Sequence, residues 1–491
     1  MVDRAYIGKE NPEHKSILSR GDNYMKNCLT DISCRLRYLP ALVAFSILLI
    51  STPIELPASQ PENGRQCQSI PGYPAGSITP GSRAEWQQAR TVVVHTPGDE
   101  VLFGLAHPAA ALFERPFSLD GARREHQNYI CLMSDNGAKV FRLTDILLAG
   151  TMDANGAPVP GRALDDLRSL ARNTLRYRTG ALPPKQAATQ ESYRREVIDN
   201  LHPRELLSII LQQPSVTLAS TGTHNTGLKA SYRVDPLMNL YFMRDQAITT
   251  ARGLVIGHFN SVQREPETAI ARFAYKKLGI SPIYEVTGSA RLEGGDFLPA
   301  GDTALIGQGL RTNAEAVRQL LEHQVFGTPR VAVVKDSWKN QDQMHLDTYF
   351  NIIDRNLAVI VEERINQSDG TGRIVKAADP AKKSLVDLYE LRGGSYRKTR
   401  SDIPFQEFLE KDLGMILIPV TNADQLKYGI NFLTLGRKKI LGIDGVSADY
   451  KKRLADAGVD AVWMDFHNLT GGYGAAHCTT QVIQRSEETK Q

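Results

Sequence analysis

Short runs of apolar and β-branched residues recur along the chain from about residue 90 onward. Most of these runs are followed by polar residues or glycine, which is the pattern of buried strands that end in turns. The runs that predict strands are 91–97, 253–259, 303–309, 330–336, 357–363, 414–420, 438–444 and 460–466. In the segment 311–327 between two of them, apolar residues return every three or four positions, which predicts an amphipathic helix. Strands that alternate with helices indicate an α/β fold over residues 89–491.

One stretch inside this region lacks strand-like runs. Residues 163–177 and 193–213 both have helical periodicity, and no strand-like apolar run lies between them. We therefore expect an all-helical insertion over about residues 155–215, within the α/β domain. Such an insertion could be a structural addition or could form a wall over a site.

The N-terminal region has a different pattern. Residues 38–50 are apolar, basic residues precede them, and small residues follow up to Ala58. This is the layout of a secretory signal, and the run is short for a membrane-spanning helix. We expect residues 1–58 to be a signal peptide or a membrane anchor, with Met25 as the true start. The protein would then be exported to the periplasm or secreted, or anchored in a membrane, and it would be cytoplasmic if the segment is not a real signal.

Composition changes this picture only slightly. Residues 59–88 are rich in Pro, Gly, Ser and Gln, which predicts a flexible linker. The whole chain is 42% hydrophobic and 23% charged, as expected for a globular protein. Its formal net charge is +4 and no run of Lys or Arg stands out, so the sequence does not suggest binding to nucleic acid or to an anionic membrane.

The cysteines are few and widely spaced. They are Cys28, Cys34, Cys67, Cys131 and Cys478. No C-x-x-C pair occurs, so no structural metal site is predicted. Cleavage near Ala58 would leave three cysteines, and an odd number implies at least one free thiol in an oxidising compartment. Whether Cys67 and Cys131 form a disulfide stays open at this point.

Four polar clusters lie at or beside strand-like runs. They are 238–246 with Asn239, Arg244 and Asp245, 291–297 with Glu293 and Asp296, 344–350 with His345 and Asp347, and the glycine-rich 471–478 with His477 and Cys478. His345 and Asp347 alternate as on a strand, so we expect both to point to one face. Each cluster taken alone also fits a structural role, such as a turn, a surface ion pair or an inert thiol.

Taken together, the clusters indicate a chemistry. A cysteine nucleophile needs a thiolate, a nearby group that transfers protons, and charges that hold the electrophile. The chain offers a cysteine, a histidine and several carboxylates, and an excess of carboxylate suits a cationic substrate. A guanidinium is planar and has N–H donors that carboxylates accept in pairs. The carbon of a guanidino group, attacked by Cys478, is therefore a reasonable electrophile.

From about residue 90 to its end, the chain resembles arginine deiminases of the guanidino-group-modifying (pentein) superfamily. The resemblance rests on VVVHTPGDEVLF (92–103), NLYFMRD (239–245), RLEGGDF (291–297), MHLDT (344–348) and a late glycine-rich cysteine, in that order. The expected helical insertion favours arginine deiminase within the superfamily. The resemblance implies a five-bladed, pseudo-symmetric α/β propeller with the site at its centre, and it implies that no metal or organic cofactor is required.

The resemblance also implies a role for each residue that matches the family pattern. Cys478 attacks the guanidinium carbon of arginine. His345 protonates the departing ammonia and later activates water against an S-alkylthiouronium intermediate, which gives citrulline. Asp245 and Asp347 clamp the guanidinium nitrogens, and Glu293 pairs with the substrate or with His345.

The same resemblance places Arg264 and Arg311 at the α-carboxylate of arginine, with Asn239 helping at the amino-acid end of the substrate. Two features depart from the family pattern. Tyr473 and His477 are unusual, because the family usually has a more uniformly glycine-rich run here, commonly with arginine directly before the cysteine. An export signal is also unusual, because arginine deiminases are usually cytoplasmic.

The leading hypothesis is therefore hydrolysis of free L-arginine to citrulline and ammonia. The partners that it implies are a small guanidino substrate and water, with no nucleic acid, and a second copy of the chain is a further candidate partner. One alternative is an amidinotransferase, or a hydrolase of another guanidino compound. A second alternative is a catalytically silent propeller that serves in binding, although the retained set of catalytic residue types argues against it.

Overall fold

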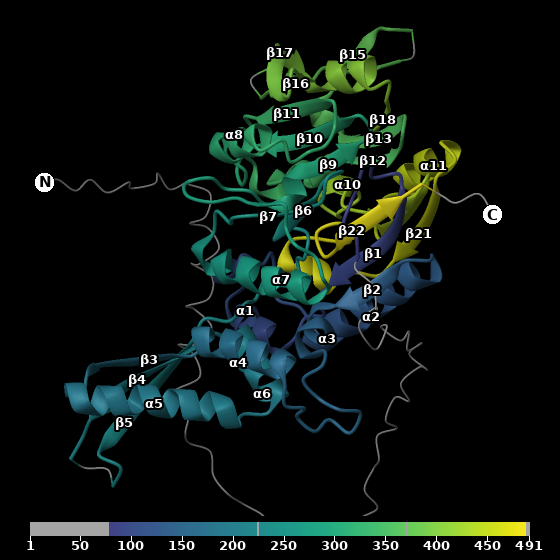
Figure 1. The fold of residues 1–491 in the computed structure, drawn as a ribbon. Helices are drawn as coiled ribbons and strands as arrows, with labels where there is room; N and C mark the ends of the chain where they lie inside the picture. The colour runs from purple at the N-terminus through teal and green to yellow at the C-terminus, as the bar shows by residue number, and fades with distance from the viewer. Residues whose placement is uncertain (1–77, 223–224, 370, 381, 488–491) are drawn as a thin grey trace, which may run out of the picture. The chain divides into compact units, whose positions relative to one another are not determined.

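The computed structural model describes residues 78–222, 225–369, 371–380 and 382–487 (Figure 1). The expected signal or anchor over residues 1–58, the expected start at Met25, and Cys67 all lie outside these residues. In the part of the chain that is described, no helix is both long enough and apolar enough to cross a lipid bilayer.

Five units of the described chain repeat one topology. In each unit an antiparallel pair of strands is followed by a third strand that runs parallel to the second. The strands are β22 (Gln481–Ser486), β1 (Gln88–Val94) and β2 (Lys139–Arg142); β6 (Ala247–Thr249), β7 (Leu254–Ile256) and β8 (Tyr284–Glu285); β9 (Phe297–Ala300), β10 (Thr303–Gln308) and β11 (Arg330–Asp336); β12 (Phe350–Asp354), β13 (Leu357–Val361) and β18 (Ile416–Val420); and β19 (Leu433–Gly436), β20 (Lys439–Ile443) and β21 (Asp460–Met464). Because the last strand pairs with the first, the two ends of the described chain complete one unit together.

A helix lies in the crossover between the second and third strands of four of these units. These helices are α2 (Leu119–Asp135), α7 (Glu265–Lys277), α8 (Ala314–Glu322) and α11 (Ala448–Asp456). Helix α8 illustrates why they form, because the Asn313 side chain accepts a hydrogen bond from the Ala316 N–H at its N-terminus. One face of α8 then buries Ala316, Val317 and Leu320, the spacing of an amphipathic helix.

All eight predicted strands are confirmed, because each expected run contains one strand of the five units. Strands such as β7 and β13 are buried along their whole length, which explains why they read as unbroken apolar runs. The predicted helix over 311–327 is confirmed as α8. The α/β class of the fold follows from these elements.

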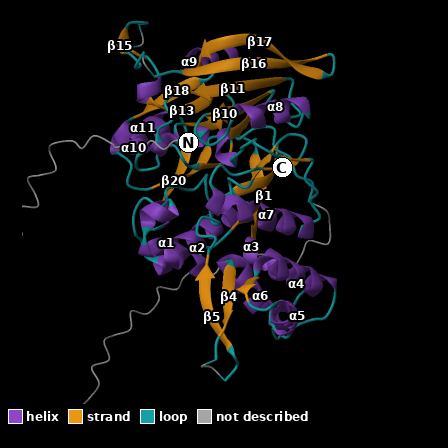
Figure 2. Ribbon diagram, turned by 90° about the vertical axis from the view of Figure 1, so that its left-hand side faces the viewer, coloured by secondary structure: helices purple, strands orange, loops and turns teal. Residues whose placement is uncertain are grey.

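The insertion is not all-helical, and this prediction is wrong. It holds the helices α4 (Arg162–Thr174), α5 (Pro184–Asn200) and α6 (Pro203–Gln212), but also a sheet of β3 (Arg176–Ala181), β4 (Pro214–Ser220) and β5 (Leu228–Val234) (Figure 2). Strands β3 and β5 leave most of their side chains exposed, so no apolar run marks them in the sequence. The predicted helix over 193–213 is interrupted because Pro203 begins α6 with His202 as its N-terminal cap.

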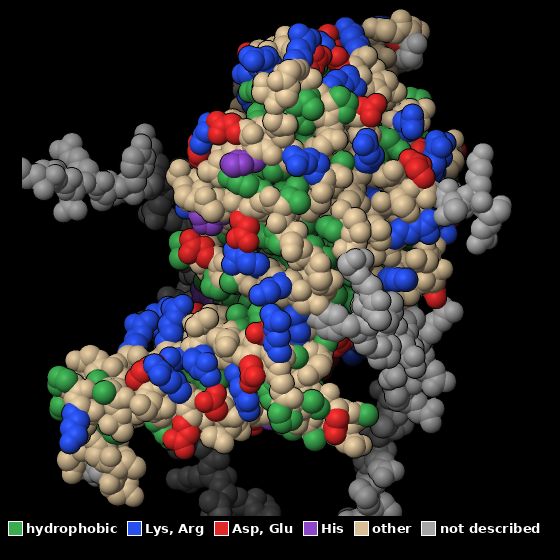
Figure 3. Space-filling view, in the orientation of Figure 1, with side chains coloured by type: hydrophobic (Ala, Val, Ile, Leu, Met, Phe, Trp, Pro, Cys, Tyr) green, Lys and Arg blue, Asp and Glu red, His purple; other side chains and the backbone are tan. Residues whose placement is uncertain are grey.

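The surface of the insertion is charged. Lys and Arg side chains gather over α4 and α5 in Figure 3. Several of them pair with acidic neighbours, as Arg172 does with Asp199 at 2.8 Å and Arg168 with Asp165 at 3.6 Å. This side of the insertion therefore presents a polar face to solvent.

The long connection between β13 and β18 contains a hairpin that the sequence did not reveal. Strands β16 (Ser384–Arg392) and β17 (Ser395–Pro404) pair with each other and extend the sheet of β9, β10 and β11 to five strands. Strand β17 is polar and largely exposed, and in β16 Asp387 and Glu390 interrupt the apolar residues, so neither strand reads as an unbroken apolar run. The remaining short elements are α1 (Leu102–Ala106), α3 (Leu143–Leu148), α9 (Phe405–Glu407), α10 (Asn422–Gln425), β14 (Gln367–Ser368) and β15 (Ile374–Lys376).

The end of the expected linker over residues 59–88 is part of the folded core. Ala84, Glu85 and Trp86 are at most 6% exposed, and Trp86 belongs to a hydrophobic cluster. The carboxylate of Glu85 accepts a hydrogen bond from Arg485. A composition rich in small and polar residues predicts a flexible linker only where the chain finds no partners, and here strand β22 provides them.

Candidate active site

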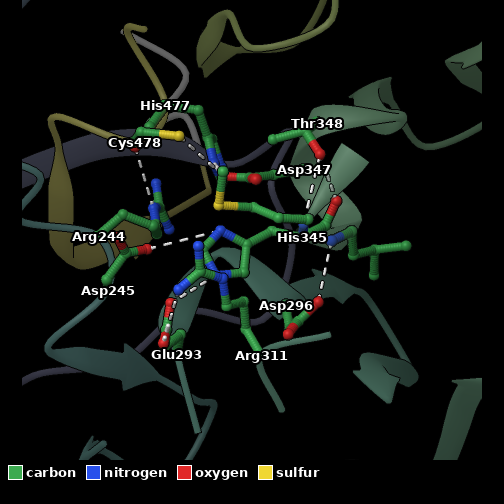
Figure 4. Close-up of polar contacts among 12 residues, drawn as sticks. Arg244, Asp245, Glu293, Asp296, Arg311, His345, Asp347, Thr348, His477 and Cys478 are labelled. Carbon is green, nitrogen blue, oxygen red and sulfur yellow. Dashed lines mark hydrogen bonds and ion pairs between the residues drawn. The ribbon is translucent and has the colours of Figure 1, made fainter. Parts of the chain in front are cut away.

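Five of the candidate residues meet at one buried place (Figure 4). Cys478, His345, Glu293, Asp245 and Asp347 are each at most 5% exposed. Each of them lies in the short segment just before the first strand of a unit, that is, before β22, β12, β9 or β6. The repeated topology therefore delivers residues that are far apart in sequence to a common place.

His345 is held between two carboxylates. Its Nε2 lies 2.9 Å from Glu293 Oε2, and its Nδ1 lies 3.9 Å from Asp245 Oδ1. Burial alone lowers the pKa of His345, but the negative charges of Asp245, Glu293 and Asp296 outweigh it and raise the pKa to about 9. The imidazole is therefore protonated at neutral pH and can donate a proton.

Glu293 is the ionised partner in this pair. Burial raises its pKa, but the hydrogen bond and charge of His345, with the more distant Arg311 and Arg264, lower the pKa well below its usual range. The sequence left two partners open for Glu293, the substrate or His345, and in the structure its carboxylate contacts His345.

His345 and Asp347 do not share a strand face, so this prediction is wrong. They flank Leu346 in a tight turn, and strand β12 begins only at Phe350. The Thr348 hydroxyl donates a hydrogen bond to the His345 carbonyl at 2.7 Å, which closes the turn. The two side chains consequently have different partners: His345 contacts Glu293, whereas Asp347 contacts His477 and lies near Cys478.

Cys478 is a buried thiol beside a carboxylate. Its Sγ lies 3.9 Å from Asp347 Oδ2, and its backbone N–H donates to Asn431 Oδ1 at 3.2 Å. Burial raises the pKa of the Cys478 thiol well above its usual value, and the negative charges of Asp347 and Asp245 raise it further. The thiolate that a nucleophile requires is therefore disfavoured until positive charge enters the site. Among the described cysteines Cys131 is disulfide-bonded, which leaves Cys478 as the free thiol.

Three buried carboxylate oxygens at this place have no hydrogen-bond partner among the described residues: Asp245 Oδ1, Asp347 Oδ1 and Asp296 Oδ2. Asp245 uses Oδ2 to accept from Arg264 at 2.8 Å, and Asp347 uses Oδ2 to contact His477 Nδ1 at 2.6 Å. The Oδ1 atom of each is buried and has no hydrogen-bond partner, although Asp245 Oδ1 lies 3.9 Å from His345 Nδ1. Because unpaired buried carboxylate oxygens are costly, this arrangement is suited to a cation that donates hydrogen bonds. Asp245, Glu293 and His345 also bring possible ligand atoms within 4.8 Å of one another, which is close enough to hold a cation.

Of the three residues predicted to bind the amino-acid end of the substrate, two are occupied by protein partners. Arg264 donates to both oxygens of Glu267 and to Asp245 Oδ2, so it positions Asp245 and does not present its guanidinium to a ligand. The Asn239 side chain donates to the Ala111 carbonyl at 2.9 Å. Protein groups occupy the guanidinium of Arg311 less fully, because its contact with Glu293 is 4.0 Å long and its Nε has no hydrogen-bond partner.

His477 lies behind Asp347. It is fully buried, its Nδ1 contacts Asp347 Oδ2 at 2.6 Å, and its Nε2 lies 3.9 Å from Glu85 Oε2. The sequence marks His477 only as an unusual residue before the cysteine, and in the structure its ring contacts Asp347. This residue orients one of the two carboxylates that border the site.

The glycines before Cys478 permit close packing. A Cβ built on Gly472 would lie well inside van der Waals contact with Tyr241 Oη, and one on Gly474 would approach the ring of Phe242. The left-handed backbone in this loop falls on Tyr473, with φ of 79°, and not on a glycine. The glycines are thus needed because neighbouring side chains approach the backbone closely.

Sequence reasoning missed Asn431. Its Oδ1 accepts from the N–H groups of Ala475 and Cys478, and its Nδ2 donates to the Asp347 carbonyl at 3.1 Å. Asn431 lies just before β19 and so occupies, in the fifth unit, the position that supplies site residues in the other four. A polar residue just before an apolar strand was the available signal, and it becomes recognisable only when the repeat is known.

We predict that Gly472→Ala destabilises the protein by about 1–3 kcal/mol, because overpacking a rigid core forces side chains and backbone to shift. Denaturant unfolding of wild type and variant measures this difference. Tyr241→Phe should restore part of the loss, since it removes the buried hydroxyl that meets the new methyl group. Gly180→Ala, at a position where a Cβ meets nothing within 4 Å, is the matched control. Equal stability of Gly472→Ala and wild type would contradict the packing argument.

The family model and the sequence relatives that match this chain agree on one family. A family model described as arginine deiminase matches residues 110–485. An arginine deiminase of Halobacterium salinarum is 25% identical and aligns over 82% of this chain and 96% of its own length, and one of Rhodococcus erythropolis is 27% identical over 75% and 92%. Among solved structures, an amidinotransferase from Microseira wollei covers 84% of this chain with 13% identity and a TM-score of 0.49. A dimethylarginine dimethylaminohydrolase adduct covers 80% of this chain with 13% identity and a TM-score of 0.43.

Proposed function

The chain belongs to the arginine deiminase family, and we propose that it hydrolyses the guanidinium group of free L-arginine to give L-citrulline and ammonia. The observation that carries the proposal is the pair of unpartnered oxygens, Asp245 Oδ1 and Asp347 Oδ1, beside a thiol and an imidazolium. The N–H groups of a planar guanidinium satisfy such oxygens, and its charge offsets theirs.

Binding of the substrate prepares the nucleophile. The carboxylates of Asp347 and Asp245 raise the pKa of Cys478 in the free protein. A guanidinium held between them brings a positive charge close to Sγ and lowers that pKa again, because an opposite charge favours the thiolate. Asp347 Oδ2 lies 3.9 Å from Sγ and is the carboxylate oxygen toward which the thiol donates, so it is a candidate acceptor for the thiol proton. The thiolate thus forms where the electrophile is already placed.

The first chemical step joins Sγ to the guanidinium carbon. The resulting tetrahedral adduct collapses with cleavage of one bond from that carbon to a terminal nitrogen. The nitrogen leaves as ammonia after it takes the proton of the His345 imidazolium, whose raised pKa keeps that proton in place at neutral pH. What remains on Cys478 is an S-alkylthiouronium, and His345 is neutral.

The second step reverses the role of His345. Neutral His345 removes a proton from a water molecule, and the oxygen attacks the thiouronium carbon. The carbon–sulfur bond then breaks, and the new hydroxyl loses its proton to the released ammonia or to solvent as the ureido carbonyl of citrulline forms. Asp347 returns the thiol proton to Sγ, which restores the cysteine. Glu293, 2.9 Å from Nε2, keeps the ring oriented in both steps. Arg311 is the candidate partner of the substrate α-carboxylate, and Arg264 acts through Asp245.

We further propose that the five units form a five-bladed, pseudo-symmetric propeller with the site at its centre. Support comes from the repeated strand order and from the pairing of the last strand with the first. The equivalent positions of the site residues, each before the first strand of a unit, also support it. An experimental structure in which the units do not surround one axis would overturn this arrangement.

We also propose that the protein is exported. The only support for this proposal is the apolar run over residues 38–50. The full chain should be produced with its N-terminal region intact, and cell fractions should be examined by N-terminal sequencing. A mature N-terminus near Ala58 in the exported fraction supports a cleaved signal. An intact N-terminus in the cytoplasm contradicts export.

The proposed reaction predicts that the purified protein converts L-arginine into a ureido product and ammonia in equal amounts, with a kcat of about 1–10³ s⁻¹. Colorimetric detection of citrulline and an enzyme-coupled ammonia assay measure the two products. A parallel reaction with an added primary amine tests amidinotransfer, in which the amine replaces water and no citrulline forms. Failure to release either product from any guanidino compound would exclude the proposed function.

A further inference from the structure

A cavity of about 320 Å³ borders the site on the side of the cysteine loop. Asn431 forms part of its wall, and the same residue holds the backbone N–H of Cys478. Tyr473 of the glycine-rich loop lines it too, as do Met344 and Thr348, the chain neighbours of His345 and Asp347. A cavity of this size lies at the lower end of the range for small-molecule sites.

The charge of this cavity is negative. Glu114 and Asp342 line it, and no Lys or Arg does. Glu114 Oε2 accepts a hydrogen bond from the Tyr428 hydroxyl at 2.6 Å. Within the described residues neither carboxylate forms an ion pair with Lys or Arg, although most acidic residues around the molecule have such partners. The cavity therefore favours a cation and repels an anion.

An independent feature of the wall points to a hydrogen-bond donor. Gln425 is only 6% exposed, and its Nε2 donates to the Asp342 carbonyl at 2.8 Å. That bond fixes the amide, yet its Oε1 has no hydrogen-bond partner. Buried amide oxygens are normally satisfied, so this unpartnered acceptor on a residue that lines the cavity is consistent with a ligand that carries N–H groups.

We propose that Glu114 and Asp342 bind the ammonium end of the guanidino substrate, so that the enzyme requires a substrate amine more than a substrate carboxylate. This proposal rests on the proposed deimination at Cys478 and narrows its substrate class to guanidino compounds that carry a primary amine. L-arginine belongs to this class through its α-ammonium group. A decarboxylated analogue, 4-guanidinobutylamine, also belongs to it, whereas 4-guanidinobutyrate does not.

The arrangement of polar and apolar groups is consistent with such a substrate. The guanidinium would lie at Cys478 between the oxygens of Asp245 and Asp347, and the ammonium would lie at the carboxylates of the cavity. The aliphatic chain between the two cations is apolar, and Met344 and Leu426 provide apolar wall for it. A substrate with only a carboxylate at this end would face two like charges.

The test compares three substrates with the wild-type chain: L-arginine, 4-guanidinobutylamine and 4-guanidinobutyrate. Loss of the carboxylate should reduce kcat/KM by less than about tenfold, and loss of the amine by about 100-fold or more, each tenfold step corresponding to about 1.4 kcal/mol. The double variant Glu114→Gln/Asp342→Asn should raise KM for the two amine substrates by at least about tenfold. Its kcat should stay near wild type, because these residues touch no reacting atom.

The matched control is Glu196→Gln, which removes an exposed carboxylate from α5 and should leave all three KM values unchanged. Binding of 4-guanidinobutylamine, measured by calorimetry with both wild type and the double variant, decides the inference even if no substrate is turned over. Weaker binding to the double variant supports the amine site. Equal binding of 4-guanidinobutylamine to wild type and to the double variant overturns it. An equal reduction of kcat/KM for 4-guanidinobutylamine and for 4-guanidinobutyrate, relative to L-arginine, also overturns it. Absence of turnover with intact amine binding would overturn only the proposed reaction.

Discussion

Replacing Cys478 by alanine is expected to lower kcat for arginine by about 10⁴-fold or more, since removal of a covalent nucleophile removes the whole catalytic route. The fold should survive, because only one buried sulfur atom is lost, at a cost of about 1 kcal/mol. Steady-state assays of citrulline formation measure the first effect, and denaturant unfolding measures the second. A variant that is stable and retains activity near wild type would remove Cys478 as the nucleophile.

The intermediate offers a direct check on the same residue. Acid quenching of wild type during turnover should trap a covalent adduct on Cys478, with the mass of arginine less that of ammonia. Digestion and mass spectrometry locate the adduct. Cys478→Ser is the informative control, because a hydroxyl preserves the size and hydrogen bonding of the side chain but is a much weaker nucleophile, so no adduct should accumulate. An adduct elsewhere in the chain would contradict the assignment.

The second large effect is expected at His345. His345→Asn should lower kcat by about 10²–10⁴-fold, because the variant has neither the acid that protonates ammonia nor the base that activates water. In wild type, kcat/KM should fall as the pH rises through about 9, where the free enzyme loses the imidazolium proton. The sign follows from the raised pKa: below 9 the acid is present, and above 9 it is lost. The pH profile of kcat/KM measures this limb directly.

An isothiourea analogue of arginine separates the two roles of His345. Its thiol leaving group departs with little need for protonation, so His345→Asn should still form the thiouronium from it and then stall before hydrolysis. The expected result is a burst of thiol release equal to the enzyme concentration. His467→Asn, which changes an exposed histidine, should behave as wild type. If His345→Asn shows no burst of thiol release and is inactive with both arginine and the isothiourea analogue, the ring is needed only for structure.

The buried charges behind the site explain why its geometry is so strongly determined. Glu85 accepts a hydrogen bond from Arg485 and lies 3.9 Å from His477, which in turn contacts Asp347. Burial raises the pKa of Glu85, but Arg485 and His477 outweigh this and lower it to about 2, so the carboxylate stays ionised. Removing one partner of such a buried pair leaves an uncompensated charge. The segment before β1 therefore helps to hold a carboxylate of the active site.

Much of the candidate site could be predicted from the sequence. Apolar, β-branched runs determine strands through local burial, so all eight expected strands are present. The ordered motifs around Asp245, Glu293, His345 and Cys478 identify the family. Strands β3, β5 and β17 escaped prediction because their side chains are largely polar or exposed, and such strands carry no periodic signal. Strand β16 escaped it because Asp387 and Glu390 interrupt its apolar residues.

Only the tertiary structure decided how these residues are used. In the sequence, His345 and Asp347 look like neighbours on one strand face, but a turn closed by Thr348 gives them different partners. Arg264 looks available to a substrate, but buried carboxylates occupy it. The physical reason is the separation along the chain of the residues that determine each feature. Strand and helix patterns depend on residues a few positions apart, whereas the direction of a side chain in a turn depends on hydrogen bonds and charges from distant segments, which meet only when the five units have folded.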